Sequence, residues 1–388
     1  MKLTVNQKVL EKALAHATWI IEKKQAVPVL GYILFATTPD KRLSITATNM
    51  DMTINDVLDC QVVEDGQYCL PAGLLHDITR KMSPGSNVTF EFDKSANSIK
   101  MTSDRASFSI HYIEADSFPP IAAMDYPVSF QMNTKTFKKA IDVAKVAMLL
   151  DNTRFHLNGI HWHYENDLGQ NKICFVATDL FRISCVSTSA PAIAQKMEPI
   201  IVSKRAVWEM LKLIDGSSDE ELKISISENR ILFSLVTSDG ILSEFSSRLI
   251  NGTFPEYKAA LNVSNDKVLE VNTKDFVAAL DRVSTVVMDS TSSVKLEISR
   301  DKLTLTGISR ELGSATEEID ASFNAFEPLE ICFNSRFLLE ILREIETPQV
   351  TILLAESKSS TIIKPTVTGA VPVVDMCFAV MPIEVVNS

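Results

Sequence analysis

Three stretches of the chain share one pattern of apolar positions at helical spacing, and each begins with an asparagine suited to cap a helix. They are NQKVLEKALAHA from Asn6, NTKTFKKAIDVA from Asn133 and NTKDFVAALDRV from Asn272. Apolar residues three and four apart form one face of a helix, and an Asn side chain accepts hydrogen bonds from the first free N–H groups. We therefore predict three amphipathic helices spaced 127 and 139 residues apart.

A second set of helical patterns keeps almost the same spacing. It comprises PAGLLHDITRKM from Pro71, SKRAVWEMLKLI from Ser203 and NSRFLLEILREI from Asn334. Segments between the helices, such as SNVTFEFDKSANSIKMTS, alternate apolar and polar residues and contain Asn or Asp turns, which is typical of antiparallel strands. Each repeat is thus predicted to pack two helices on antiparallel sheet, an α+β architecture.

Other features recur in the same register. RLSITATNMDMTI from Arg42 and KICFVATDLFRIS from Lys172 share a strand followed by Ala-Thr-Asn/Asp, KLTLTGISRELGS from Lys302 is a looser third copy, and Phe118-Pro119 recurs as Phe254-Pro255. Self-similarity at a fixed period is the mark of repeated domains. The sequence predicts three copies of one domain, at 1–127, 128–262 and 263–388, with linkers at 119–127 and 262–267.

The net charge of −11 argues against general affinity for nucleic acid, so any such affinity depends on where the basic residues lie. On the helix after Asn133, Phe137, Ala140, Ile141, Ala144 and Met148 form one stripe, and Lys135, Lys138, Lys139, Asp142 and Lys145 form the other. The other five helices repeat the pattern more weakly. If equivalent helices line one concave surface, the chain presents a mildly basic lining beneath an acidic exterior. Acidic residues on the same helices predict loose, salt-dependent attraction to phosphate.

We expect a cytoplasmic protein, because the N-terminal residues lack the apolar stretch of a secretory signal and no segment approaches a membrane-spanning length. The six cysteines show neither Cys-x-x-Cys pairs nor zinc-like spacing, so we expect reduced, mostly buried thiols.

No phosphate-binding glycine loop, nucleophile elbow or zinc-protease helix occurs in the sequence. His156, His161 and His163 come nearest to a metal cluster, but His161 and His163, which would share one face of a strand, have no third ligand of convincing spacing. Asp51, Asp151 and Asp179 stand near strand ends, where Asp caps or turns. We predict no catalytic residue, metal or cofactor. Three hypotheses stay open at this point: a processivity ring on DNA, an enzyme using His161, His163 or the recurring Asp residues, and a protein-interaction scaffold without nucleic acid.

Five segments in order carry a specific resemblance: VPVLGYILF from Val27, FHLNGIHW from Phe155, VATDLFRIS from Val176, NGTFPEYK from Asn251 and AVMPI from Ala379. Together with the threefold repeat, they resemble the bacterial DNA polymerase III beta subunit family, the beta sliding clamps, over essentially the whole chain. The resemblance implies the DNA-clamp fold, a head-to-tail homodimer that forms a six-domain ring, and a non-catalytic processivity factor. Such a ring encircles duplex DNA and slides without sequence specificity.

The resemblance also implies three groups of site residues. DNA contacts map onto Lys24, Arg80, Arg154, Phe155, His156, Lys204 and Arg205. A hydrophobic pocket for partner peptides maps onto Leu157, Thr178, Leu180, Arg182, Ile183, Pro255, Phe337, Val380, Met381, Pro382 and Ile383. Apolar dimer contacts map onto Phe108, Ile110 and Val286, for which an ordinary core position is the alternative, as it is for Leu157 and Ile183 in the pocket.

The implied partners are double-stranded DNA, the DNA polymerase III alpha subunit, the clamp loader delta subunit, and other polymerases and repair proteins with clamp-binding peptides; no membrane is implied. The chain departs from the family at several positions. Gly73-Leu74 replaces a basic pair, His156 replaces an aromatic residue, Leu180-Phe181 replaces a Gly-His pair, and Ala259-Ala260 replaces a bulkier pair. These changes bear on the first-domain DNA contact and the preferred peptide, and the tail EVVNS after Ile383 is expected to cover part of the pocket rim.

Overall fold

The structure is a computed structural model that describes residues 1–22, 27–93, 96–121, 124–151, 153–217, 220–287, 292–367 and 374–383. Lys24 and the tail after Ile383 lie outside these ranges. The chain divides into two compact units. The first unit comprises Met1–Lys135, Pro191–Glu198 and Arg205–Leu249, and the second comprises Thr136–Ala190, Pro199–Lys204 and Ile250–Ser388.

The first unit contains two antiparallel sheets. A five-stranded sheet has the order β5-β1-β7-β8-β9, and a nine-stranded sheet has the order β10-β6-β2-β3-β4-β18-β17-β16-β11. The bounds are β1 Lys2–Asn6, β2 Tyr32–Thr37, β3 Leu43–Thr48, β4 Met52–Leu58, β5 Gln61–Glu64, β6 Gln67–Pro71, β7 Asn87–Asp93, β8 Ser98–Ser103, β9 Ala106–His111, β10 Ile113–Glu114, β11 Val128–Asn133, β16 Glu221–Ile226, β17 Arg230–Val236 and β18 Leu242–Arg248.

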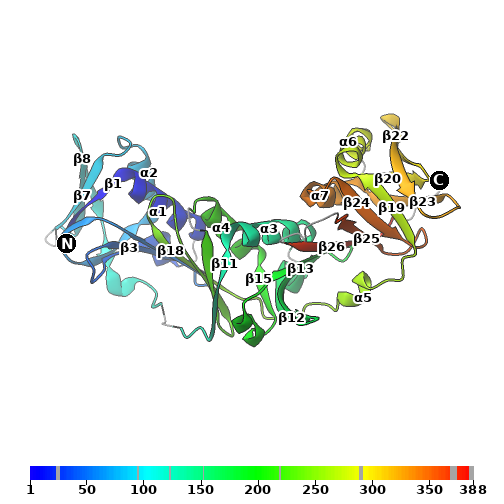
Figure 1. Cartoon of the computed structure of the whole chain (residues 1–388). Helices are drawn as coiled ribbons and strands as arrows, with labels where there is room; N and C mark the ends of the chain where they lie inside the picture. The colour runs from blue at the N-terminus through cyan, green and yellow to red at the C-terminus, as the bar shows by residue number, and fades with distance from the viewer. Residues whose placement is uncertain are drawn as a thin grey trace. The chain divides into compact units, whose positions relative to one another are not determined.

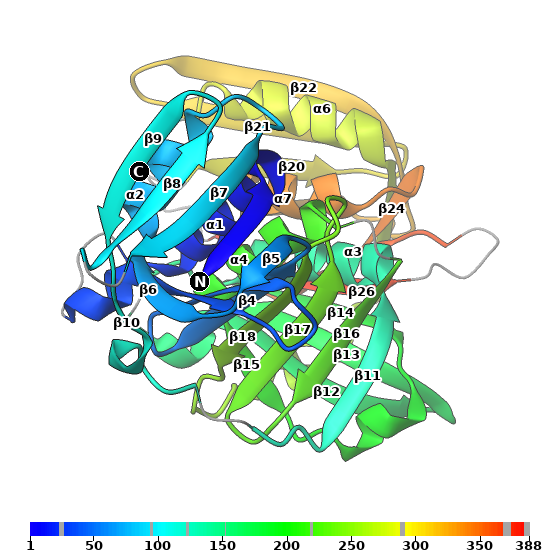
Figure 2. The same ribbon diagram turned by 90° about the vertical axis from the view of Figure 1, so that its left-hand side faces the viewer.

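Helices cover the apolar faces of these sheets. Helix α1 (Gln7–Ile20) packs against α2 (Ala72–Arg80), β3 and β4 (Figures 1 and 2). Leu10 and Leu14 of α1 are fully buried, and the rings of Phe35 and Phe90, which come from different sheets, lie 5.0 Å apart. Most of α4 (Lys204–Asp215) also belongs to this unit.

The second unit contains twelve strands in the order β15-β12-β13-β14-β26-β25-β24-β19-β22-β21-β20-β23. The bounds are β12 Gly159–Asp167, β13 Gln170–Thr178, β14 Arg182–Ser189, β15 Ile200–Ser203, β19 Lys267–Asn272, β20 Ser293–Ile298, β21 Lys302–Ser309, β22 Gly313–Phe323, β23 Leu329–Asn334, β24 Gln349–Leu354, β25 Thr361–Pro365 and β26 Asp375–Val380. Its helices are α3 (Thr134–Ala144, except the first two residues), α5 (Lys258–Leu261), α6 (Thr273–Ser284) and α7 (Ser335–Glu344).

Aromatic residues fill one part of this core. The ring of Phe137 from α3 lies 5.5 Å from Trp162 and 5.8 Å from Phe175, and all three side chains are fully buried. Helices α6 and α7 pack against each other, and α6 covers β21 and β22 (Figure 1). Burial of large aromatic side chains supplies much of the free energy that holds helix to sheet.

The six helices predicted from the repeat are present at the expected positions. Asn6 caps α1 by accepting from the Lys8 N–H, and Asn272 and Asn334 each accept from two N–H groups at the starts of α6 and α7. The predicted apolar stripe of α3 is buried along its length, from Phe137 to Met148. The prediction of repeated helix pairs on antiparallel sheet is therefore confirmed.

Sheets continue from one sequence repeat into the next by strand pairing. In the first unit β4 pairs with β18, and Met52 lies opposite Ser247. In the second unit β14 pairs with β26, and Arg182 lies opposite Val380. In the described parts of the two predicted linkers, Lys267 begins β19 and the other residues form neither helix nor strand.

Candidate functional sites

The segment Thr178–Arg182 forms a tight turn between β13 and β14. The hydroxyl of Thr178 donates to the Arg182 carbonyl at 2.8 Å and accepts from the Leu180 N–H at 3.0 Å. Asp179 Oδ1 accepts from the N–H groups of Phe181 (3.0 Å) and Arg182 (2.9 Å). Leu180 has a φ of 76°, a left-handed conformation that only a well-fixed turn imposes on leucine.

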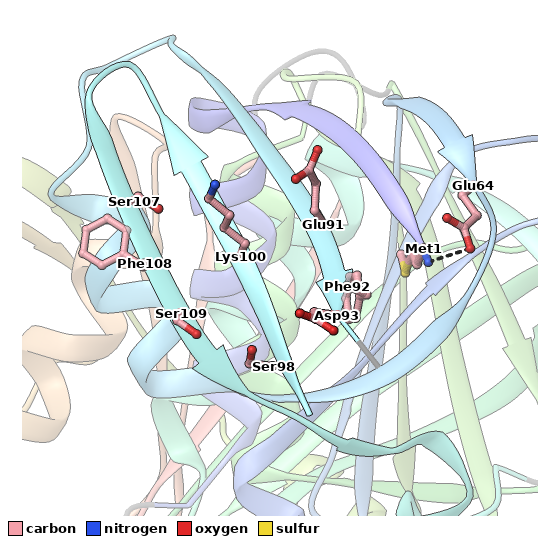
Figure 3. A pocket seen from close by; sticks show the side chains of 10 residues that line it. All are labelled: Met1, Glu64, Glu91, Phe92, Asp93, Ser98, Lys100, Ser107, Phe108 and Ser109. Atoms are coloured by element: carbon pink, nitrogen blue, oxygen red, sulfur yellow. Dashed lines mark ion pairs between the residues drawn. The ribbon is translucent and has the colours of Figure 1, made fainter. Parts of the chain in front are cut away.

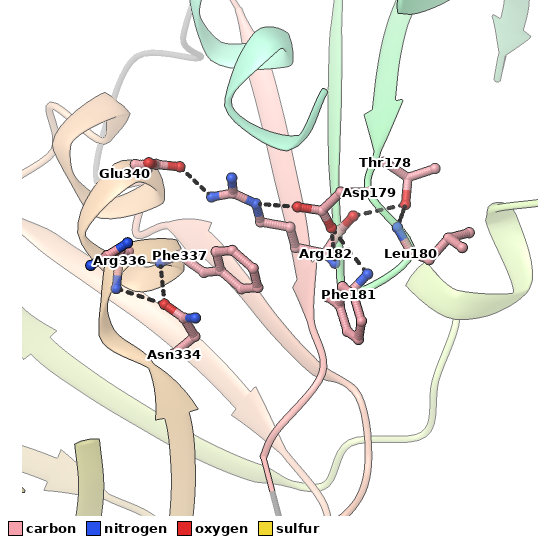
Figure 4. Close-up of polar contacts among 9 residues, drawn as sticks. All are labelled: Thr178, Asp179, Leu180, Phe181, Arg182, Asn334, Arg336, Phe337 and Glu340. Atoms are coloured by element: carbon pink, nitrogen blue, oxygen red, sulfur yellow. Dashed lines mark hydrogen bonds and ion pairs between the residues drawn. The ribbon is translucent and has the colours of Figure 1, made fainter. Parts of the chain in front are cut away.

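Arg182 ties this turn to α7 (Figure 4). Its guanidinium pairs with Asp179 at 3.0 Å and with Glu340 at 2.6 Å, and it lies 4.2 Å from the centre of the Phe337 ring. The Arg182 side chain is only 9% exposed, so its hydrogen bonds are formed largely away from water, where they are stronger. The network fixes the position of the turn relative to helix α7.

The end of β26 completes this site. The Met381 N–H donates to the Phe181 carbonyl at 2.8 Å, and the Ile383 N–H donates to the Cys332 carbonyl at 2.8 Å. These bonds hold the AVMPI segment beside the turn. Leu180, Phe181 and Met381 are 47%, 63% and 44% exposed, so the turn presents an apolar surface.

The predicted pocket residues fall into three sets. Thr178, Leu180, Arg182, Ile183, Phe337 and Met381 lie in or around the turn just described, and Pro255, Pro382 and Ile383 are partly exposed. Leu157 and Val380 are fully buried and offer no surface to a ligand. Sequence reasoning missed Glu340, and it identified Asp179 as a turn residue but not as a partner of Arg182. The signal for Asp179 was its place at a strand end, where Asp binds backbone N–H groups two and three residues later.

The basic residues predicted for DNA contact lie in different surroundings. Arg154 and Phe155 are exposed on the loop that precedes β12, and Phe155 is 59% exposed. The Lys204 N–H donates to the Asn158 carbonyl at 2.9 Å and its ammonium group to the Leu150 carbonyl at 2.5 Å, so the start of α4 is fixed to this loop. His156, in the same loop, is half-buried with its ring 5.7 Å from that of Phe155.

Two predicted arginines of the first unit are already in ion pairs. Arg80 lies 3.3 Å from Asp77 and is exposed, whereas Arg205 binds Glu22 at 2.6 Å and the Ile20 carbonyl at 3.0 Å. On α3, Asp142 pairs with both Lys138 and Lys145. The basic helix faces are therefore partly neutralised, which weakens long-range attraction to phosphate.

β9 and part of β22 have a partner strand on one side only, as do β5, β10, β11, β15 and β23 at the ends of the described sheets. β9 ends the five-stranded sheet, and Gly313–Asp320 of β22 pair with β21 alone. Figure 3 shows Ser107, Phe108 and Ser109 along β9 beside Lys100 of β8, at an open hollow of about 760 Å³. Of the predicted apolar contacts, Phe108 and Val286 are partly exposed, while Ile110 is 4% exposed, as an ordinary core residue would be.

The histidines considered for catalysis lie on the outer face of β12, beneath the segment 254–261. His161 stacks on Phe254 at 4.7 Å, and His163 Nε2 lies 2.7 Å from the Tyr257 hydroxyl. Burial lowers the pKa of His161 to about 4, with the neighbouring His163 adding to the shift. His163, Glu165 and Cys174 have donor atoms within 4.8 Å of one another, but Glu165 is also paired with Lys258 at 2.8 Å.

All six cysteines are free thiols, as predicted. Burial raises the pKa of Cys69 and Cys377 to about 11 and that of Cys185 to about 12. A thiol with so high a pKa carries little thiolate at neutral pH and is a poor nucleophile or redox group. The cysteines therefore act as small apolar side chains.

Repeated domains in which helices pack on antiparallel sheet are the architecture of DNA clamps. Family models of the DNA polymerase III beta subunit match the chain in three consecutive parts: the N-terminal domain at residues 1–123, the central domain at 131–256 and the C-terminal domain at 258–378. The chain belongs to this family, the beta sliding clamps.

Individual relatives agree with this assignment over their whole length. The beta sliding clamp of Caulobacter vibrioides is 31% identical over 385 residues, which cover 99% of this chain and 100% of the relative, and that of Escherichia coli K12 is 28% identical over 363 residues, 93% and 94% of the two chains. A solved Caulobacter crescentus clamp superposes with a TM-score of 0.91 at 30% identity, and a Bartonella birtlesii clamp with 0.90 at 30%; both matches cover 99% of this chain and 100% of the other.

The predictions of family, fold class and function are confirmed. The protein is a DNA sliding clamp that serves DNA polymerase III, and it is a non-catalytic processivity subunit. Among the described residues, no helix is both long and apolar enough to cross a membrane.

Proposed function

We propose that two copies of this chain close head to tail into a six-domain ring around duplex DNA. The observation that carries the proposal is the pair of open strand edges, β9 and Gly313–Asp320 of β22. An open edge exposes unpaired N–H and C=O groups and is a template for another strand. Joining the β9 edge of one copy to the β22 edge of the other satisfies both edges, and twofold symmetry then closes the ring.

Charge supports this pairing. Lys100 and Arg105 stand at the β8–β9 hairpin, and Glu317 and Glu318 stand along β22, where they also pair with Arg282 and Lys302. Opposite charges on two edges select the partner and its register. Phe108 supplies an apolar contact at the β9 edge, and Val286 supplies one on the side of the third repeat.

Solution mass tests the dimer. We expect twice the chain mass of 43.0 kDa for the wild type and 43.0 kDa for Phe108→Asp, because a carboxylate would be buried without a partner. Phe326→Asp is the matched control, since Phe326 is 95% exposed in the loop after β22 and should leave the dimer unchanged. A monomeric wild type, or dimers of both variants, would contradict the proposed interface.

DNA is held mainly by encirclement in this proposal. Arg154, Phe155 and Lys204 contact the sugar-phosphate backbone from one fixed loop, and His156, Arg80 and Arg205 add weaker contacts. Lys24 is retained as a contact from the resemblance alone. Partial neutralisation of the helix faces suits sliding, because a ring need not bind phosphate tightly once it is closed. The working compartment is the cytoplasm, where a bacterial chromosome is copied.

Partner proteins bind at the turn Thr178–Arg182 in this proposal. The exposed apolar side chains Leu180 and Met381, with Ile183 and Pro255 beside them and Pro382 and Ile383 after them, offer anchor sites for a short peptide. The C. crescentus clamp has been crystallised with PEG in a region described as tethering the beta motif. The partners are the polymerase III alpha subunit, the clamp loader delta subunit, and other polymerases and repair proteins.

Anisotropy of a labelled clamp-binding peptide tests this site. Met381→Ala and Ile183→Ala should each weaken binding about tenfold while the dimer stays intact, because each removes an apolar anchor. Leu168→Ala is the control, since Leu168 is fully exposed on the turn between β12 and β13 and belongs to no proposed binding site. Unchanged affinity in both pocket variants would overturn the assignment.

A further inference from the structure

A second turn, Thr48–Met52, reproduces the hydrogen bonds of the turn Thr178–Arg182. The Thr48 hydroxyl donates to the Met52 carbonyl at 2.9 Å and accepts from the Met50 N–H at 3.1 Å. Asn49 Oδ1 accepts from the Asp51 and Met52 N–H groups, as Asp179 does in the other turn. Met50 has a φ of 78°, against 76° for Leu180. The scaffold of the peptide site is therefore present twice in the chain.

The strand that completes the site is duplicated too. The Arg248 N–H donates to the Asp51 carbonyl at 2.8 Å, as the Met381 N–H does to the Phe181 carbonyl. Arg248 thus occupies the position of Met381 at the end of a strand paired to the turn. The apolar side chain of Met381 beside one turn is therefore replaced by the guanidinium group of Arg248 beside the other.

An open groove of about 620 Å³ lies beside the second turn, within the first unit. Ser44, Thr46 and Asn55 from β3 and β4 line it, and Pro119, Met124 and Tyr126 of the linker line it from another side. The equivalent positions on β13 and β14 are Cys174, Val176 and Cys185, which pack against Phe254, Tyr257 and Leu261. Polar residues in the first copy replace an apolar cluster in the second.

The charge of the groove is positive although the chain is acidic overall. Its lining holds two guanidinium groups, Arg230 and Arg248, and one carboxylate, Glu244. Arg230 is held by the Met50 carbonyl at 2.9 Å and by the Ser246 hydroxyl at 3.5 Å, contacts that leave its charge in place. Arg248 is 63% exposed and lies 3.8 Å from Asp51, itself 73% exposed. Arg230 is fixed by neutral partners, and Arg248 has only a long, exposed contact with Asp51, so both guanidinium groups can receive a carboxylate.

We propose that this groove binds a short extended peptide that carries an acidic side chain next to an apolar one. The carboxylate binds Arg248 and Arg230, and the apolar side chain packs on Met50 and Met124. This proposal rests on the proposed partner-binding site, because it assumes that both copies of the turn serve as docking sites. Its ligand differs in charge, so one ring presents two kinds of docking site to different partner segments.

An array of blocked pentapeptides containing every combination of Asp, Lys, Ser and Leu tests the proposal with the full-length protein. Wild-type protein should bind peptides with adjacent Asp and Leu, and Arg248→Glu should lower that binding at least tenfold, since it replaces a charge-assisted bond by repulsion. Ser246→Trp, which fills the groove without changing its charge, should lower it similarly. Arg300→Glu is the control, because it reverses an exposed charge of the second unit.

Each outcome either supports or overturns the proposed groove. Binders that need Arg248 and tolerate Met381→Ala support the groove, whatever happens at the other turn. Some peptides could lose binding in Met381→Ala but keep it in Arg248→Glu and Ser246→Trp. Such peptides occupy the proposed partner site instead, and this result would overturn the groove proposal. Selection of Lys in place of Asp, or no binder sensitive to Arg248 in variants whose thermal unfolding matches wild type, also overturns it.

Discussion

Replacing Arg182 with methionine isolates the charge that holds the partner-binding turn. Methionine keeps most of the side-chain volume and its contact with Phe337, so the main loss is electrostatic. The pair with Asp179 is nearly buried, with side-chain exposures of 9% and 12%, and contributes about 2 kcal/mol as a charge-assisted hydrogen bond. Glu340 is 50% exposed, so its pair contributes about 0.5 kcal/mol.

The expected loss is therefore about 2–3 kcal/mol in the free energy of local opening. Hydrogen exchange over residues 179–183, read by mass spectrometry, measures it directly, because the N–H groups of Phe181 and residue 182 bond to Asp179. Exchange there should rise roughly 30- to 150-fold, at 1.36 kcal/mol per factor of ten. The turn should loosen without unfolding of the sheet.

Glu340→Gln is the matched control, since it retains the Arg182–Asp179 pair. It should raise exchange less than about fivefold, the effect of a half-exposed ion pair. A change below threefold for Arg182→Met, or equal changes for the two variants, would refute the reasoning that Asp179 is the dominant partner.

Two other predictions follow from the same geometry. His161 has a pKa of about 4 in the folded protein, below its ordinary 6.5, so between these pH values mainly the unfolded chain binds its proton. Stability should be steady above pH 6.5 and fall by roughly 3 kcal/mol as pH drops to 4. His161→Phe should flatten this part of a urea-midpoint profile, and an identical profile would contradict the assignment. Arg154→Ala should lower the salt dependence of duplex binding, measured by anisotropy, by about one phosphate contact, whereas Arg205→Ala should change it less because Glu22 already binds Arg205. Equal effects would show that the Glu22 pair opens on DNA.

Much of the fold was predictable because local and long-range signals agree. Asn6, Asn272 and Asn334 cap helices by short-range hydrogen bonds that depend only on neighbouring residues, and the buried stripe of α3 follows from helical period alone. The threefold repeat then set the order of helices and strands. These sequence patterns predict the fold correctly because each depends on interactions within a few residues or with the adjacent sheet.

The sites were less predictable because their charges depend on tertiary neighbours. The lysines of α3 read as a free basic face, but Asp142 on the same helix neutralises two of them, and Lys139 binds Glu344, which lies 205 residues later. The interpretation of Asp179 as a turn residue was confirmed, whereas in the first repeat the residue that makes the equivalent turn is Asn49, not Asp51. Only the folded structure shows which hydrogen-bond or ion-pair partner each side chain has.

Duplication explains why the two turns share a scaffold and differ in chemistry. Hydrogen bonds within the turns fix backbone shape, so they persist wherever Thr begins the turn and Asn or Asp follows. The side chains that face the solvent, Arg248 in one copy and Met381 in the other, are free to diverge.

Retention on DNA tests the central claim, that a closed ring holds by encirclement rather than by tight contact. After loading by a clamp loader onto a nicked circular plasmid, labelled protein should stay bound through gel filtration at moderate salt. A single restriction cut should then release it within minutes, because the ring slides off the ends. Equal retention on circular and linear DNA would show that contacts, not topology, hold the protein.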